Sequence, residues 1–94
     1  MATVLSYVVT VTTAGTAVQG PATGKGVFTI GADPANTGYI YVGSDGAGDV
    51  ASTNGHKLGA GQQVLIQTGN MNQVWFDASV NGEKATILAF EFFN

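Results

Sequence analysis

Apolar and polar residues alternate along most of this chain, which is the period of a β-strand with two different faces. Turn-forming residues separate the alternating stretches about every eight to twelve positions, and no helical period is evident. The sequence therefore predicts an all-β fold: a single-domain antiparallel β-sandwich over residues 1–94, jelly-roll-like, with seven or eight short strands. The extended segments are expected at 3–12, 16–19, 27–32, 39–42, 62–67, 73–79 and 84–93.

The chain between residues 26 and 43 has the pattern of strand, turn and strand. Pro34 lacks an N–H group and therefore cannot lie in a central ladder. Asn36 and Gly38 tolerate a positive φ, which allows the chain to reverse. We therefore expect a β-hairpin in which residues 33–38 form the loop.

Asn81-Gly82 is the strongest hairpin signal in the sequence, and it predicts a type I′ turn between segments 73–79 and 84–93. The second of these segments is apolar on both faces, so we expect a central strand that is covered on both sides. For segment 3–12, the predicted core face consists of Leu5, Tyr7, Val9 and Val11. The rest of the predicted core consists of Phe28, Ile30, Ile40, Val42, Val64, Ile66, Val74, Phe76, Leu88 and Phe90, with Leu58 reaching back into it.

Charge is sparse, and this narrows the functional classes. Three Lys and Arg residues stand against six Asp and Glu residues, which gives a net charge of −3. Without a basic patch the chain is not suited to bind nucleic acid or an anionic membrane surface. There is no cysteine, so disulfides and thiolate chemistry are excluded. No apolar run approaches the length of a membrane span.

His56 is the only histidine, and a Ser-His-Asp arrangement would need it together with Ser6, Ser44, Ser52 or Ser79. None of these serines has the spacing of a nucleophile elbow. We expect His56 to be a loop residue, and we expect no catalytic residues and no enzyme activity.

Asp45 and Asp49 lie among glycines in segment 43–55, as acidic residues do in calcium-binding loops. Their spacing fits neither an EF-hand nor a glycine-rich calcium repeat, and two carboxylates are few for an ion that prefers about six to eight oxygen ligands. The segment is expected to be a solvated loop, so we expect no metal site and no cofactor.

Asp77, Glu83 and Glu91 are the residue types of a glycosidase acid pair. Glu83 falls in a predicted turn, where a solvated charge is the simpler interpretation. Trp75 lies beside Asp77, and an aromatic ring next to a carboxylate is also a combination that can bind a sugar. A packed surface tryptophan is the simpler interpretation there.

Tyr39, Tyr41 and Trp75 are the candidate interface residues. Tyrosine and tryptophan bring large contact area at low entropic cost and are enriched at the centres of interfaces. Because few ion pairs can form with so little charge, we expect self-association or docking through neutral surface.

Four blocks of the sequence resemble, in the same order, a group of small β proteins of tailed bacteriophages. Together they extend over most of the chain, from residue 14 to residue 87, and they consist of strand pattern and turn residues. The blocks are AGTAVQ (Ala14–Gln19), ADPANTGYIYVG (Ala32–Gly43), STNGHKLGAGQ (Ser52–Gln62) and VWFDASVNGEKATI (Val74–Ile87).

This resemblance implies a structural protein of the phage particle, above all a capsid decoration, or cement, protein on the outside of the assembled head. Its partner would be the major capsid protein or another virion protein. Symmetric placement on a head implies a homo-oligomer, a trimer or a dimer. The alternative is a carbohydrate- or receptor-binding β-sandwich module of a phage tail or fibre, which would use Trp75 and segment 43–55.

Overall fold

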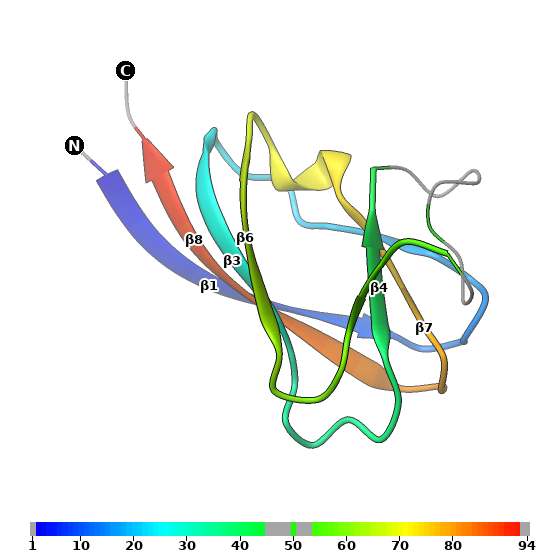
Figure 1. Ribbon diagram of the computed structural model, residues 1–94. Helices are drawn as coiled ribbons and strands as arrows, with labels where there is room; N and C mark the ends of the chain where they lie inside the picture. Colours follow the sequence, from blue (N-terminus) through cyan, green and yellow to red (C-terminus); the bar gives the residue numbers. More distant parts are fainter. Residues whose placement is uncertain (1, 45–49, 51–53, 93–94) are drawn as a thin grey trace.

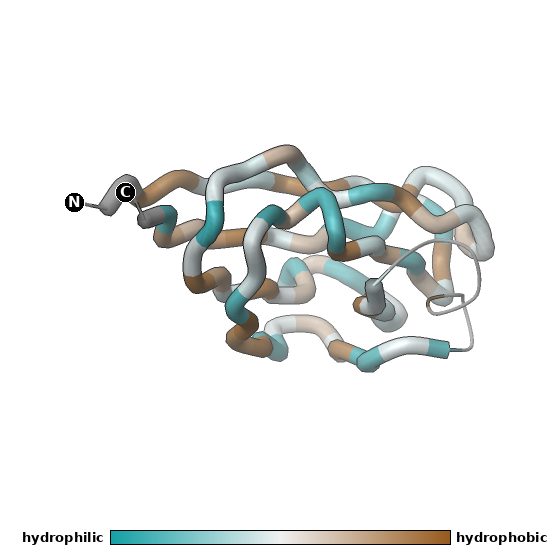
Figure 2. The backbone as a smooth tube through the Cα atoms, turned by 90° about the horizontal axis from the view of Figure 1, so that it is seen from above, coloured by the Kyte–Doolittle hydropathy of each residue, from teal (hydrophilic) through white to brown (hydrophobic). Residues whose placement is uncertain are grey.

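The computed structural model describes residues 2–44, 50 and 54–92. They form eight strands and one 3-10 turn, arranged as two sheets packed face to face (Figures 1 and 2). The predicted antiparallel β-sandwich is therefore confirmed. The elements are β1 (Ala2–Val11), β2 (Val18–Gln19), β3 (Gly26–Ala32), β4 (Ile40–Gly43), β5 (His56–Leu58), β6 (Gln63–Thr68), η1 (Met71–Gln73), β7 (Trp75–Ala78) and β8 (Glu83–Phe92).

The strand pairs are nested within one another along the chain. Sheet A has the order β1-β8-β3-β6, and sheet B has the order β2-β7-β4-β5. The first strand thus pairs with the eighth, the second with the seventh, the third with the sixth and the fourth with the fifth, all antiparallel. Every connection except the one between β4 and β5 consequently carries the chain from one sheet to the other.

The predicted hairpin around residues 33–38 is wrong, because β3 lies in sheet A and β4 in sheet B. The side chain of Asp33 stabilises a turn at the start of this loop: its Oδ1 accepts a hydrogen bond from the N–H of Ala35 at 2.9 Å. The loop is then fastened to β8: Asn36 Nδ2 donates to the carbonyl of Lys84 at 2.8 Å, and Lys84 N–H donates back to Asn36 Oδ1 at 3.0 Å. The loop therefore turns a corner of the sandwich.

The predicted hairpin at Asn81-Gly82 is not formed either, since β7 lies in sheet B and β8 in sheet A. Gly82 has a φ of +82°, but no non-glycine residue in the described part of the chain has a positive φ. A type I′ turn needs positive φ at both central positions and is therefore excluded. Gly82 N–H instead donates to the carbonyl of Val11 at 2.8 Å, which ties this corner to the end of β1.

Most of the predicted core is found between the two sheets. Val9 and Val11 of β1 are buried, Leu58 reaches the core as expected, and Tyr7 packs against it. Five further predicted residues are also buried, namely Phe28, Ile30, Ile40, Val74 and Phe76. Partly buried residues that pack against the core are Val42, Val64 and Ile66.

The prediction that Leu88 and Phe90 belong to the core is wrong, because they are 54% and 46% exposed on the outer face of sheet A. The inner face of β8 instead carries Ala85, Ile87 and Ala89, all buried. The two alanines suit this face because bulky neighbours fill the space, as Phe28 does opposite Ala89. The strand is central in sheet A as predicted, but the described residues do not cover its outer face.

Gly26 begins β3 and lies opposite Glu91 of β8. A Cβ atom at this position would lie far inside contact distance of the carbonyl oxygen of Phe90, which is backbone and cannot swing away. We expect Gly26→Ala to lower the free energy of unfolding by about 1–3 kcal/mol, measured by urea denaturation. Gly69→Ala is the control, since a Cβ there meets no atom within 4 Å. Equal stability of the two variants would contradict this packing.

Candidate functional site

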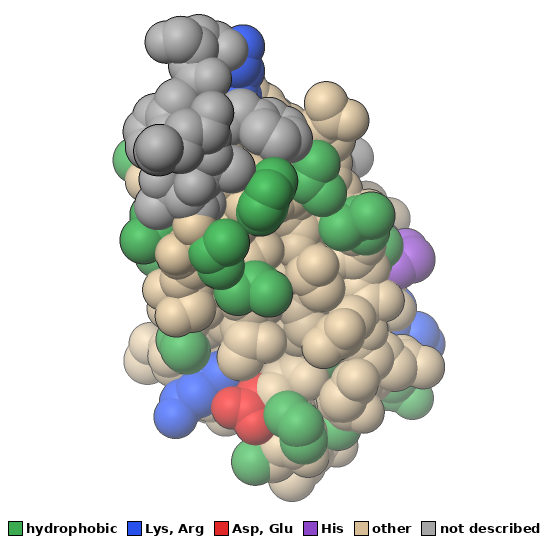
Figure 3. Space-filling view, turned by 90° about the vertical axis from the view of Figure 1, so that its left-hand side faces the viewer, with side chains coloured by type: hydrophobic (Ala, Val, Ile, Leu, Met, Phe, Trp, Pro, Cys, Tyr) green, Lys and Arg blue, Asp and Glu red, His purple; other side chains and the backbone are tan. Residues whose placement is uncertain are grey.

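Most of the large exposed apolar side chains lie on the outer face of sheet A. Side chains directly opposite each other in antiparallel strands point the same way. The register therefore places Val4 beside Phe90, and Thr29 between Leu88 and Leu65. We call this set the apolar face of sheet A; it consists of Val4, Val8, Leu65, Leu88 and Phe90. Figure 3 looks onto this side and shows hydrophobic side chains gathered near its middle.

The apolar face of sheet A is nearly free of charge. Among the described strand residues whose side chains alternate onto this face, only Lys84 is charged, and it lies at the end of β8. Charged side chains accordingly appear at the margins of the face in Figure 3. The polar residues between the apolar ones carry hydroxyl or amide groups: Ser6, Thr10, Thr29, Gln63, Gln67 and Thr86.

A shallow hollow of about 400 Å³ lies on this same face. Gly31 has no side chain, so the surface is low between Thr86 on one neighbouring strand and Gln63 on the other. Val8 and Leu88 contribute apolar walls to the hollow. The outer face of sheet A is therefore hollowed and not flat.

The three predicted interface residues share the outer face of sheet B. Tyr41 lies opposite Asp77, Trp75 lies opposite Gly43, and Tyr39 precedes Tyr41 by two positions. We call Tyr39, Tyr41 and Trp75 the aromatic face of sheet B. Tyr39 is exposed, whereas the other two rings are half-buried.

A cation lies over one of these rings. The ammonium group of Lys57 is 4.4 Å from the centroid of the Tyr39 ring, which is the geometry of a cation–π contact. Lys57 reaches this position because it pairs with Tyr41 across β4 and β5. Lysine and aromatic rings thus form one connected surface on the outside of sheet B.

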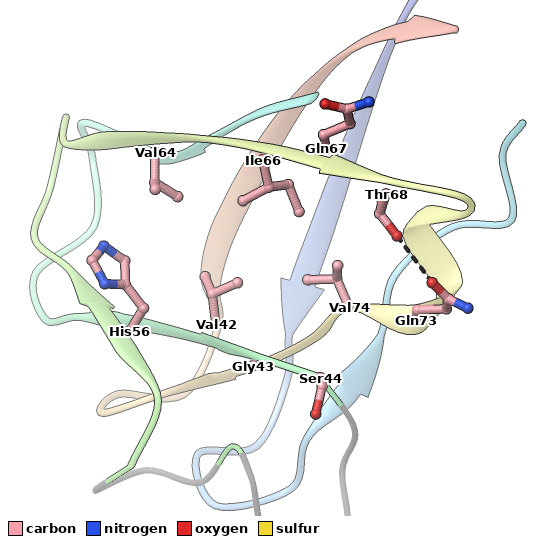
Figure 4. Close-up of a pocket in the computed structure, with 10 residues that line it drawn as sticks. All are labelled: Val42, Gly43, Ser44, His56, Val64, Ile66, Gln67, Thr68, Gln73 and Val74. Carbon is pink, nitrogen blue, oxygen red and sulfur yellow. Dashed lines mark hydrogen bonds between the residues drawn. The ribbon is translucent and has the colours of Figure 1, made fainter. Parts of the chain in front are cut away.

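The prediction that His56 is a loop residue is wrong. His56 begins strand β5 and pairs with Val42 of β4. Its ring points into a hollow of about 400 Å³ that opens between the two sheets (Figure 4). The hollow has an apolar lining, formed by Val42, Val64, Ile66 and Val74. Its rim includes Ser44 and a hydrogen bond from Thr68 Oγ1 to Gln73 Oε1 of 3.0 Å.

No Ser-His-Asp set forms around His56 in the described part of the chain. Of the four serines considered with it, Ser44 lines the same hollow, but no described carboxylate does. Ser6 lies on the outer face of sheet A, and Ser79 Oγ accepts a hydrogen bond from Tyr39 N–H at 2.9 Å. Ser52 lies outside the described residues.

Glu83 is not the solvated turn charge that the sequence predicted, since it is only 6% exposed. Its carboxylate accepts hydrogen bonds from the backbone N–H groups of Thr37 and Gly38. These are two donors of the corner loop, which would otherwise need water. Glu83 therefore stabilises the loop that joins β3 in sheet A to β4 in sheet B.

Asp77 is also structural. Its side chain is fully buried beneath the loop that follows β1, and Oδ1 accepts hydrogen bonds from the N–H groups of Gly15 at 2.9 Å and Ala78 at 2.7 Å. The other oxygen, Oδ2, has no hydrogen-bond partner among the described residues. Asp77 therefore does not supply an accessible acid beside Trp75.

Glu91 holds the loop before β3 and the side chain of Tyr7. Its Oε1 accepts a hydrogen bond from Gly24 N–H at 2.9 Å, and its Oε2 accepts one from the Tyr7 hydroxyl at 3.5 Å. The three carboxylates considered as glycosidase acids are thus each engaged separately in holding the fold.

The described residues contain no group of three or more His, Asp or Glu side chains that could hold a metal ion. Asp45 and Asp49, considered above for calcium, lie outside the described residues. No helix in the described part of the chain is long and apolar enough to cross a membrane.

No protein-family model matches the chain, and no curated protein or solved structure is similar enough to it to match. The resemblance to phage proteins consequently depends on the four sequence blocks alone.

Sequence reasoning missed the apolar face of sheet A, although a signal for it exists. Leu88 and Phe90 alternate with Ile87 and Ala89, so the last strand has two apolar faces. Alternation shows that such a strand has two faces to cover, but it does not show that one of them lies on the outside of the domain.

Removing the Glu83 carboxylate tests its role at the corner. We expect Glu83→Ala to lower the free energy of unfolding by about 1–3 kcal/mol, because it leaves two partly buried N–H groups without their acceptor. Thermal and urea unfolding measure this. Lys84→Ala is the neighbouring exposed control, and an equally small effect of both substitutions would show that the loop does not need the carboxylate.

Tyr7 supplies a test in alkaline solution. Burial, the negative charge of Glu91 and the hydrogen bond to Glu91 all raise the pKa of Tyr7 above its usual value. A raised pKa means that the fold favours the neutral phenol. This contribution to stability is therefore complete below about pH 10 and is lost as the pH rises through the pKa of Tyr7 in the folded protein.

An ultraviolet titration of Tyr7, with Tyr39 and Tyr41 replaced by phenylalanine, measures that pKa. We expect Glu91→Gln to lower the pKa of Tyr7 without returning it fully to the usual value, because burial is unchanged. A Tyr7 that titrates identically with and without the Glu91 charge would contradict the contact.

Proposed function

We propose that this protein is a structural, non-catalytic component that docks onto another protein surface. In the setting that the sequence resemblance implies, it is a capsid decoration, or cement, protein on the outside of an assembled phage shell. The observation that carries the proposal is the apolar face of sheet A.

The energetic argument starts from exposure. Leu65 and Leu88 are 66% and 54% exposed and lie on one continuous, nearly uncharged face. Several large exposed apolar side chains gathered on one face of a small protein are typical of an interaction site. Covering it with another protein removes apolar area from water, at about 25 cal/mol for each Å². The hydroxyl and amide groups between the apolar side chains can form hydrogen bonds at the same interface.

The fold is compatible with this role. The nested strand order supports a jelly-roll-like form of the sandwich, an architecture used by viral capsid domains and by lectins. This is an analogy between folds, and it fits the cement role and the sugar-binding alternative equally well. The choice between them therefore depends on the surfaces.

The alternative function is a carbohydrate- or receptor-binding module of a phage tail or fibre. The aromatic face of sheet B favours it, since Tyr39, Tyr41 and Trp75 share one surface with Lys57. Two of the three rings are half-buried, however, which leaves less ring surface for stacking on a sugar. We therefore rank docking through sheet A above it.

Co-sedimentation with shells assembled from the major capsid protein of the same genome tests the docking role. We expect the wild-type protein to bind, and we expect Leu65→Ser and Leu88→Ser each to weaken binding about tenfold, which corresponds to about 1.4 kcal/mol of lost apolar contact. Val80→Ser is the matched control, because Val80 is a similarly exposed apolar residue outside the sheets. Added salt should change the affinity little, since this face carries almost no charge.

Two results would contradict the proposal. One is a wild-type protein that does not bind shells at any salt concentration. The other is binding that Val80→Ser weakens as much as Leu88→Ser does. Binding to host glycans that is lost in Trp75→Ala and unchanged in Leu88→Ser would establish the alternative.

A further inference from the structure

Strand β1 has one free edge. It is the outermost strand of sheet A, and in the described part of the chain it forms a ladder only with β8 (Figure 1). The strand is ten residues long and contains neither a charged residue nor a proline. Folded proteins usually protect such an edge with charge, proline, a bulge or a short strand, because exposed N–H and C=O groups pair with other chains.

The outer strands of sheet B are protected in these ways. Strand β2 has two residues, and Gly20-Pro21 follows it. Strand β5 has three residues and carries Lys57. The opposite edge of sheet A, β6, has six residues. The edge of β1 is therefore the longest unprotected edge that the structure describes.

The sequence of β1 is nearly symmetric about Ser6. Moving outward from Ser6, the first neighbours are the large side chains Leu5 and Tyr7, and the second neighbours are Val4 and Val8. An antiparallel pair related by a two-fold axis places each residue opposite its mirror position, so such a strand complements its own copy. Because β1 has no charge, no like charges meet when two copies pair.

We propose that β1 pairs antiparallel with β1 of a second copy of this chain, about a two-fold axis at Ser6. The two A sheets then form one continuous eight-stranded sheet. Val4 lies opposite Val8 of the second copy on the outer face, and Leu5 lies opposite Tyr7 of the second copy on the inner face. This pairing does not depend on the docking function proposed above.

The register follows from the faces. Val4, Ser6 and Val8 point outward, and in the joined sheet each outward residue must lie opposite an outward residue of the second copy. This holds only if the two-fold axis lies at a residue position; an axis between two residues would place outward residues opposite inward ones. The axis at Ser6 pairs the two exposed valines with each other. It also covers Leu5, which is 40% exposed although it lies on the inward side of β1. An axis at Tyr7 would instead place Val4 opposite Thr10.

Dimerisation in this way would also change the docking surface. The outward faces of both copies lie on the same side of the joined sheet, and Val4 and Val8 lie at the seam. The two apolar faces of sheet A therefore become one surface with two-fold symmetry. Two linked copies of a docking face bind a symmetric shell more tightly than one copy does.

Charges placed at Ser6 test the axis directly. Ser6→Lys and Ser6→Glu each put two like charges opposite one another across it, and the exposed position of Ser6 allows the fold to accept them. In sedimentation velocity we expect a wild-type dimer at high concentration and at least about tenfold weaker self-association of either variant alone. An equimolar mixture of the two variants should dimerise again. Gln63→Lys, on the β6 edge, is the matched control and should dimerise like the wild type.

A cysteine supplies a second test, because the chain has none of its own. Directly opposite residues in antiparallel strands have Cα atoms about 4.5–5.5 Å apart, within the range of a disulfide. Ser6→Cys should therefore form a covalent dimer under mild oxidation, much faster than Gln63→Cys does. The inference is overturned if the wild type is monomeric at every concentration, if Ser6→Lys dimerises like the wild type, or if the two cysteine variants cross-link at the same rate.

Discussion

The antiparallel ladder between β1 and β8 joins the two ends of the chain, and the rest of the fold depends on it. It runs from Ala2 opposite Phe92 to Val11 opposite Glu83, and every other strand pair is nested inside it. Closing so long a loop costs conformational entropy that local contacts cannot offset. The core between the sheets offsets this cost. Its largest side chains are Phe28 of β3 and Phe76 of β7, and β8 contributes Ala85, Ile87 and Ala89.

The same ladder determines the surfaces of the molecule. Because β8 is bonded to β1 on one side and β3 on the other, it is interior to sheet A, and β1 becomes the edge. On its inner face β8 places Ala89 beside Phe28 and Ile87 beside Ile30 of β3. Leu88 and Phe90 alternate with these inward residues, so they point outward and form the centre of the apolar face of sheet A. One arrangement thus accounts for the exposed face and for the free edge.

The sequence predicted the strands other than β5, because alternation and turn residues are local signals and β5 has only three residues. It did not predict which sheet each strand joins, since Asp33–Gly38 and Asn81-Gly82 have turn chemistry that suits a hairpin and a corner equally. What makes them corners is long-range: Glu83 binds the first loop, and Val11 binds Gly82. The common face of Tyr39, Tyr41 and Trp75 likewise follows only from the register of β4 and β7.

Hydrogen–deuterium exchange along β1 tests most directly whether this strand is closed on one edge by β8 and open on the other. In an antiparallel edge strand, alternate amides point into the ladder and outward. The account predicts that slow and fast amides alternate from residue 3 to residue 10 in dilute protein, and that the fast set becomes slow at high concentration as copies pair. Uniformly fast amides would contradict the β1–β8 ladder. Uniformly slow amides at every concentration would contradict the open edge.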